Sequence, residues 1–456
     1  MEDLISLLTG ASSQKELRNS GGNYYFNPVI QCVCQTIPLL EQLYSKTISE
    51  QPLTEAFVTF LYDRDLHVHV GPPAQNKYFV QFFEQLYKSL PTFGKFRKHD
   101  SRDLLIEFFN ILISEERHSA ALSPHFHRDP KTVLTAVDEV FGGHFITVHS
   151  CLTCSQRNFV CEYLLDISLS ISMPKQQRYS VGGSGESSQL SRQRVCSSAV
   201  DKRQEFRHSA YIAQSNELKR VFLEVLNEEQ NKPQEEGRGN FTKPTTLTDC
   251  LRFYTATMPS GYHCLSCQGG NQTSGTTTPQ ASPHSEKRTL IYDPPAILLL
   301  HMKRFEQKTY TAGFKQFSQK VTYEELLDLG PYCSSDCLRL DPTDKNVWYS
   351  LYGVVVHIGT LESGHCIAYL KMRNSKSKAT KEFLQKSFLD RDEVATKQMN
   401  NLLYGRKTGD RKMEWRPIPT AGGKWICVSD TDTRDATSQE ALNQEAFMLF
   451  YERVPN

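Results

Sequence analysis

The sequence predicts an α+β fold, with helices in the first part of the chain and a mainly β remainder. Residues 100–117 carry apolar side chains at helical spacing, which predicts an amphipathic helix. Two strand-like segments follow, at 145–150 and 163–171. In the last third, five apolar segments predict a series of buried strands: 296–305, 348–360, 365–372, 424–430 and 446–454.

The composition excludes several classes of protein. The chain has 456 residues, 39% of them hydrophobic, which is enough for two or three domains or for one large fold with insertions. The formal net charge of +1 argues against nucleic-acid binding, and no apolar run is long enough to span a membrane. The N-terminal residues lack the basic start of a secretory signal, so we expect the protein in the cytoplasm, the nucleus or both.

Three tracts interrupt the globular pattern, at about residues 175–243, 269–287 and 374–423. They are rich in charged residues or in Ser, Gln, Thr and Gly, and they are poor in apolar side chains. Such segments bury too little surface to offset the entropy lost on ordering. We therefore expect them to be insertions that do not pack.

The stretch "NSGGNYYFNPVIQCVCQTIPLL", residues 19–40, predicts a Gly-rich turn that leads into a helix. The helix is expected to begin near Phe26, with Pro28 in its first turn. Turns of this kind often present a nucleophile, because a helix N-terminus stabilises negative charge. The position at which a thiol would be expected holds Tyr24.

Two Cys-x-x-Cys pairs predict a structural zinc site. In a reducing compartment, closely spaced cysteines are typical of metal binding rather than of disulfides. Four thiolates complete a tetrahedral zinc ribbon, so the nearby His149 and His263 are interpreted as surface residues. The expected ligands are Cys151 with Cys154, and Cys264 with Cys267.

A second pattern indicates hydrolase chemistry. In "SGHCIAYL", His365 follows a Gly turn at the start of a predicted strand, and the next predicted strand, "KWICVSD", begins near a tryptophan and ends in an acid. A histidine and an acid on neighbouring strands suit a hydrolase of the Cys-His-Asp/Asn type.

These motifs resemble those of the ubiquitin-specific proteases, a family of papain-like deubiquitinating cysteine proteases. The cysteine box of that family, L-x-N-L-G-N-T-C-Y-M-N-S-V-L-Q-C, aligns without gaps with "LRNSGGNYYFNPVIQC", residues 17–32. "SGHCIAYL" resembles the histidine box, and "DEVFGGHF", "CEYLLDISLSI", "PPAILLLHMKRF" and "AFMLFYERV" resemble other family signatures. The chain is most similar to the zinc-finger-linked members.

The resemblance implies a papain-like cysteine protease fold with a thumb, a palm and zinc-ribbon fingers. The helical first part would form the thumb, the zinc knuckles would tip the fingers and the last strands would form the palm. Residues 1–16 would be an N-terminal segment, and residues 17–456 one protease-like domain that contains the three insertions.

Carried over by position, the resemblance implies a damaged active site. Tyr24 occupies the nucleophile position, and Ser429 occupies the position of the Asp or Asn that orients the histidine. His365 keeps the base position, Asp430 matches an assisting acid, and Asn19 matches the residue that stabilises the oxyanion.

Neither of the nearest cysteines is expected to replace the missing thiol. Cys32 lies eight residues from Tyr24, about 12 Å along a helix, at a position that is usually apolar core. Cys34 is no better placed.

The resemblance also implies ubiquitin or a ubiquitinated protein as partner. Asp100 occupies a position where a family acid meets the basic ubiquitin tail, and Asp103 replaces the usual Glu nearby. The interpretation is an inactive, ubiquitin-binding scaffold, which could act within a complex. Two alternatives stay open: an active deubiquitinase, and a structural module without ubiquitin binding.

Overall fold

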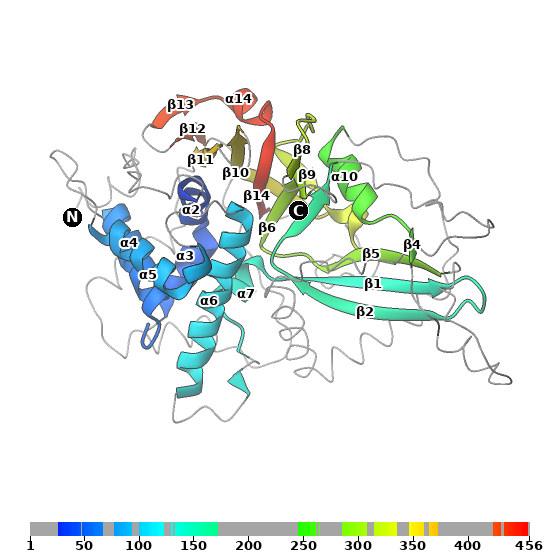
Figure 1. The fold of residues 1–456 in the computed structure, drawn as a ribbon, viewed down its shortest axis with the longest axis horizontal. Helices are drawn as coiled ribbons and strands as arrows, with labels where there is room; N and C mark the ends of the chain where they lie inside the picture. Colours follow the sequence, from blue (N-terminus) through cyan, green and yellow to red (C-terminus); the bar gives the residue numbers. More distant parts are fainter. Residues whose placement is uncertain are drawn as a thin grey trace, which may run out of the picture.

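The computed structural model describes the chain in segments that contain each predicted helix and strand, apart from the last residue of the predicted strands 348–360 and 424–430. The described residues are 26–46, 48–66, 77–93, 100–122, 129–130, 133–171, 245–260, 264, 285–307, 314–334, 346–359, 364–372, 423–429 and 433–454. Figure 1 shows the N-terminal helices on one side of a large sheet, with a long, narrow sheet projecting from the other side. Among the described helices, none combines the length and apolar character needed to cross a membrane.

The thumb comprises the helices before residue 142: α2 (Asn27–Cys34), α3 (Ile37–Ser45), α4 (Pro52–Leu66), α5 (Lys77–Ser89), the short η1 (Pro91–Phe93), α6 (Ser101–Leu122) and α7 (Ala136–Phe141). The predicted helices at Phe26 and at 100–117 are confirmed as α2 and α6. Aromatic rings from three helices fill the thumb core. The ring centroid of Phe57 in α4 lies 5.1 Å from that of Phe108 in α6 and 5.2 Å from that of Phe82 in α5.

The fingers are a four-stranded antiparallel sheet in the order β2-β1-β5-β4. Its strands are β1 (Gly143–Cys151), β2 (Arg157–Leu164), β4 (Met258–Ser260) and β5 (Ser285–Asp293). β5 corrects one expectation, because the tract 269–287 was expected not to pack and its last three residues belong to this strand. Ser285 is buried and donates to the carbonyl of Ser260, and Lys287 pairs with His149 and Met258. Backbone pairing on both sides holds a polar segment in place without an apolar side chain.

The palm is an eight-stranded sheet in the order β13-β12-β11-β10-β14-β6-β3, with β9 pairing to β10 beside this path. Its strands are β3 (Ile167–Ser170), β6 (Ile297–Lys303), β9 (Leu326–Asp328), β10 (Trp348–Ile358), β11 (His365–Met372), β12 (Lys424–Val428), β13 (Thr433–Ala436) and β14 (Ala446–Arg453). The predicted strands of the last third are confirmed. β3 and β6 run parallel, and the other pairs are antiparallel.

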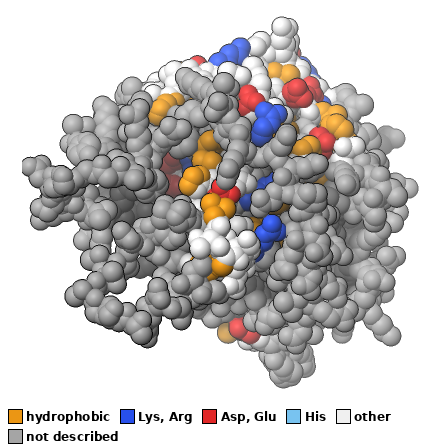
Figure 2. Space-filling model, turned by 90° about the vertical axis from the view of Figure 1, so that its right-hand side faces the viewer, with side chains coloured by type: hydrophobic (Ala, Val, Ile, Leu, Met, Phe, Trp, Pro, Cys, Tyr) orange, Lys and Arg blue, Asp and Glu red, His pale blue; other side chains and the backbone are white. Residues whose placement is uncertain are grey.

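Smaller elements complete the described residues: α10 (Leu247–Tyr254), η3 (Gly330–Tyr332), α14 (Ser438–Leu442) and a hairpin of β7 (Phe305–Gln307) and β8 (Phe314–Gln316). Two hydrophobic cores lie on the two faces of the palm. One joins the palm to the thumb and contains Val33, Phe108 and Val355, and the other contains Leu251 of α10 with Val354 and Tyr451. On the face shown in Figure 2, the described residues carry acidic and basic side chains side by side, with no large patch of one sign.

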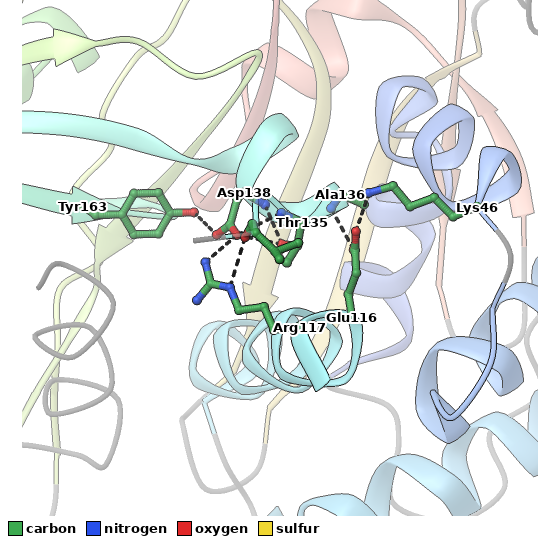
Figure 3. Close-up of polar contacts among 8 residues, drawn as sticks. Lys46, Glu116, Arg117, Thr135, Ala136, Asp138 and Tyr163 are labelled. Carbon is green, nitrogen blue, oxygen red and sulfur yellow. Dashed lines mark hydrogen bonds and ion pairs between the residues drawn. The ribbon is translucent and has the colours of Figure 1, made fainter. Parts of the chain in front are cut away.

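A buried carboxylate joins the thumb to the base of the fingers (Figure 3). Asp138 of α7 accepts hydrogen bonds from Tyr163 of β2 at 2.6 Å and from Arg117 of α6 at 2.9 Å. Thr135 and Asp138 form a capping box at the start of α7. The chain must pass close to this cluster at Gly142, because a Cβ atom there would lie 2.7 Å from the Tyr163 hydroxyl oxygen.

A second carboxylate on α6 supports the same junction (Figure 3). Glu116 forms an ion pair with Lys46 at the end of α3 and accepts the backbone N–H of Ala136 at 2.9 Å. Consecutive residues of α6, Glu116 and Arg117, thus contact both α3 and α7. The end of α6 and the start of α7 are fixed together by charge-assisted hydrogen bonds.

We predict that Tyr163→Phe lowers the free energy of unfolding by about 1–2 kcal/mol, because a buried carboxylate loses one donor. Denaturant titration followed by far-UV circular dichroism measures the change. Tyr78→Phe is the matched control, because Tyr78 lies on α5 with 37% of its surface exposed, and it should change stability by less than about 0.5 kcal/mol. Equal effects of the two substitutions would contradict the role given to Asp138.

Candidate active site and metal centre

His365 stands at one end of an inner strand of the palm. It is the first residue of β11, its side chain is exposed, and its backbone pairs with Ile358 of β10. This is the position expected from the sequence, directly after a Gly turn. An imidazole here is open to solvent and to any substrate that approaches this end of the sheet.

Ser429 lies on the strand next to His365. It follows the last residue of β12, Val428, which pairs with Ala368 of β11. Because β11 and β12 are antiparallel, this pairing places the backbone of Ser429 beside the first residues of β11, the strand that begins at His365. Asp430 lies outside the described residues.

Tyr24, at the position that the sequence analysis assigned to the nucleophile, precedes α2 in the chain. Tyr24 and Asn19 are outside the described residues, and α2 begins two to three residues after Tyr24, with Phe26 as its N-cap. Both cysteines of α2 are buried, with exposed fractions of 0% for Cys32 and 1% for Cys34.

Cys32 is enclosed between the thumb and the palm. Its Sγ would lie 3.2 Å from a Cβ atom built on Gly353 of β10, so the sulfur occupies the space that a side chain at position 353 would need. Burial raises the pKa of the Cys32 thiol well above its ordinary value, and the neighbouring Cys34 adds to this. Cys32 is therefore an uncharged core residue, as expected from the sequence, and it has no thiolate to offer.

His357 is a residue of this site that the sequence analysis did not select. It is half-buried on β10, pairs with Cys366, and its ring packs on Phe305 and Phe447 with centroids 5.0 and 6.2 Å apart. Burial, and then the electrostatic interaction with His365, lower the pKa of His357, so its imidazole is neutral at physiological pH. The sequence offered one signal for His357: a polar residue that directly follows the apolar run Val354–Val356 of β10.

Asp100 and Asp103 lie together at the N-terminus of α6. Asp100 caps the helix, because its carboxylate accepts the N–H of Arg102 at 2.8 Å and its carbonyl accepts the N–H of Leu104 at 3.1 Å. Asp103 is exposed. Burial and the charge of Asp103 raise the pKa of Asp100 to about 7, even though the capping hydrogen bond and Arg102 act in the opposite direction. One carboxylate oxygen of Asp100 thus caps the helix, and the charge of this carboxylate changes with pH near neutrality.

Three of the four predicted metal ligands meet at the end of the fingers. Cys151 ends β1, Cys154 lies in the turn to β2, and Cys264 lies between β4 and β5. Their sulfur atoms are all within 4.8 Å of one another, and the sulfurs of Cys154 and Cys264 are 3.5 Å apart. Cys267 lies outside the described residues.

This spacing suits a tetrahedral thiolate site. Four sulfurs at about 2.3 Å from one zinc ion are about 3.8 Å from each other. His149, which the sequence analysis assigned to the surface, is half-buried on β1, with Nδ1 3.4 Å from the hydroxyl of Ser260. It is not among the three residues whose ligand atoms converge. The described donors therefore fit a soft divalent metal held by cysteine.

Comparison with known proteins identifies a family to which most of the chain is similar. The family model described as ubiquitin carboxyl-terminal hydrolase matches residues 16–451. Mouse ubiquitin carboxyl-terminal hydrolase 45 is 33% identical over 171 residues, which cover 38% of this chain and 18% of the relative. Mouse ubiquitin carboxyl-terminal hydrolase 16 is 34% identical over 174 residues, with the same two coverages of 38% and 18%. The aligned part thus spans less than a fifth of the length of these relatives.

The fold is similar to that of a solved structure described as the SAGA Ubp8/Sgf11/Sus1/Sgf73 DUB module bound to ubiquitin aldehyde. The TM-score is 0.58 at 14% sequence identity, and the match covers 98% of this chain and 72% of that chain. At this identity, the likeness concerns the mixed helix and sheet fold.

Proposed function

The chain belongs to the ubiquitin carboxyl-terminal hydrolase family, and we propose that it acts in deubiquitination as a ubiquitin-binding pseudoenzyme. The observation that carries the proposal is Tyr24 at the nucleophile position, together with the burial of both cysteines in the adjoining helix. A phenol with a pKa near 10 is a weak nucleophile at neutral pH. Removing the nucleophile of a catalytic triad costs several orders of magnitude in rate.

A second substitution supports the same proposal. Ser429 stands where the family carries an Asp or Asn, beside the strand of His365. A hydroxyl orients an imidazole less firmly than a carboxylate and does not stabilise the imidazolium. Two separate positions of the site have therefore changed, while the base position is retained.

Retained acids support ubiquitin binding. Asp100 and Asp103 share one helix end, where carboxylates can accept charge-assisted hydrogen bonds from a basic ligand tail. The neighbouring solved structure is described as bound to ubiquitin aldehyde and as part of a module with Sgf11, Sus1 and Sgf73. By analogy we propose ubiquitin, or a ubiquitinated protein, as the ligand, and a scaffolding role in a complex.

We further propose that the cysteine cluster holds a structural zinc ion. Cys151, Cys154, Cys264 and Cys267 would be its ligands, and the closed set of four leaves no position for substrate. When bound, the ion would join the β1–β2 turn, which carries Cys151 and Cys154, to the segment between β4 and β5, which carries Cys264.

The zinc proposal predicts about one zinc ion per purified chain by elemental analysis, because four thiolates complete one structural site. Cys264→Ser should lower the zinc content and weaken the fingers. Cys161→Ser is the matched control, since Cys161 lies on β2 of the same sheet outside the cluster, and it should retain the metal. Well-folded wild-type protein without zinc would contradict the assignment.

The pseudoenzyme proposal predicts that wild-type protein hydrolyses a fluorogenic ubiquitin substrate no faster than His365→Ala. Tyr24→Cys restores a thiol at a helix N-terminus, so a ubiquitin-derived electrophile should label it. Adding Ser429→Asp should raise turnover by roughly tenfold to a thousandfold, which is the range that triad orienters contribute. The control is Tyr24→Cys combined with His365→Ala. Robust wild-type turnover that His365→Ala abolishes would overturn the proposal.

The binding proposal predicts that affinity for ubiquitin rises with pH. Asp100, with a pKa of about 7, is mostly protonated at pH 6 and mostly charged at pH 8, and the basic tail of ubiquitin favours the charged form. About a tenth of the carboxyl groups are ionised one pH unit below the pKa, so affinity should gain up to about tenfold between pH 6 and pH 8. Calorimetry at both values measures this.

Asp100→Asn is a suitable control for this experiment, because asparagine also caps helices and so keeps the acceptor for the N–H of Arg102. It should bind ubiquitin weakly at both pH values. A pH dependence that survives Asp100→Asn would assign it to another group. No binding at millimolar ubiquitin would favour a purely structural module.

A further inference from the structure

Arg102 lies between the two acids at the N-terminus of α6 and contacts both. Its backbone N–H donates to Asp100 at 2.8 Å, and its Nη1 donates to Asp103 at 3.1 Å. Residue 102 therefore contacts Asp100 through its backbone and Asp103 through its guanidinium. The exposed side chain of Asp103 would otherwise be free to rotate.

The guanidinium of Arg102 is itself anchored in the palm. Nε and Nη2 donate to the two oxygens of Asp166 at 3.0 and 2.7 Å, a bidentate pair in which the carboxylate is only 1% exposed. Such a fork fixes the guanidinium plane as well as its position. Asp166 directly precedes β3, so the anchor belongs to the sheet and not to the helix.

Two further residues hold Asp166 in place. The hydroxyl of Ser168 on β3 donates to Asp166 at 3.2 Å and lies 2.9 Å from Nδ1 of His301, its partner residue on β6. Burial, and then the positive charge of Arg102, lower the pKa of His301 to about 3, so the ring is neutral. A neutral ring with its proton on Nδ1 donates to Ser168, and every donor in the chain His301–Ser168–Asp166 is satisfied.

We propose that Arg102 is a positioning residue for ubiquitin binding: its bidentate pair with Asp166 fixes Asp103, and with it the first turn of α6 whose backbone N–H holds Asp100, relative to the palm, in the orientation that receives the basic tail. This inference rests on the proposed function. It assigns to the pair Arg102–Asp166 a task beyond stability, because the guanidinium that pairs with Asp166 also holds Asp103.

The test uses variants that keep the local net charge. Arg102→Lys retains one positive charge, but an ammonium cannot form the fork to Asp166 while also reaching Asp103. The pair Arg102→Gln with Asp166→Asn removes one charge of each sign and leaves no buried charge unpaired. The second variant keeps the test valid if the first one folds poorly.

Lys303→Gln is the matched control for charge. Lys303 ends β6, its side chain is exposed, and it lies near enough that Arg102 and Asp166 both influence its pKa. It forms no described hydrogen bond to Asp166. Removing this charge should leave tail-dependent affinity unchanged or slightly raised, since a basic ligand then meets one cation fewer.

The measurement is calorimetric binding of full-length ubiquitin and of ubiquitin truncated before its C-terminal tail, with melting temperatures recorded in parallel. We expect Arg102→Lys and the neutral pair to weaken binding of full-length ubiquitin by about tenfold, the loss of one charge-assisted contact. Affinity for truncated ubiquitin should not change.

Wild-type affinity retained in both variants would overturn the positioning role and leave the proposed function intact. An equal loss for both ligands would also overturn it, because a purely structural defect does not select the tail. Absence of wild-type binding would overturn the proposed function and this inference together.

Discussion

The buried carboxylate of Asp138 is the interaction on which the arrangement of thumb and fingers depends. A carboxylate in the interior is costly unless each oxygen is paired, and here the donors come from α6, from β2 and from the cap of α7. No single element can move without leaving a charge or a hydroxyl unsatisfied. The base of the fingers is thereby held at a fixed angle to the thumb, although the two parts share little core.

The same chemistry recurs near the other end of α6. Arg102, in the first turn, pairs with Asp166 of the palm, and Arg117, near the last turns, pairs with Asp138. The 22-residue helix is about 33 Å long, so these two pairs tie it at widely separated points to the palm and to α7, whose Asp138 also binds β2 of the fingers. Its apolar face, with Phe108 and Phe109, packs in the thumb core between them. α6 thus relates thumb, palm and fingers to one another.

Local pattern was sufficient to predict much of this fold. Five of the strands from Ile297 onward, β6, β10, β11, β12 and β14, are mainly apolar runs, and α6 has clear helical spacing. α4 was not assigned, because its apolar side chains surround the helix and leave no periodic signal. The cysteine pairs were recognisable from spacing, whereas the Arg102–Asp166 pair joins residues 64 positions apart, which no local pattern reveals. The pairing of Ser285–Lys287 in β5 was also missed, because backbone hydrogen bonds between strands need no particular side chains.

The positions assigned to catalysis and those assigned to binding differ in how the fold constrains them. His365 is exposed at the first residue of β11, and Ser429 lies beyond the last residue of β12, so neither contributes to a hydrophobic core. Substitution at such positions costs the fold little. Asp100 caps α6, and Arg102 compensates a buried carboxylate, so a change at either position costs stability as well as binding. In a chain of this architecture, positions 365 and 429 can therefore change at little cost to the fold, whereas positions 100 and 102 are constrained by folding as well as by the binding that we propose.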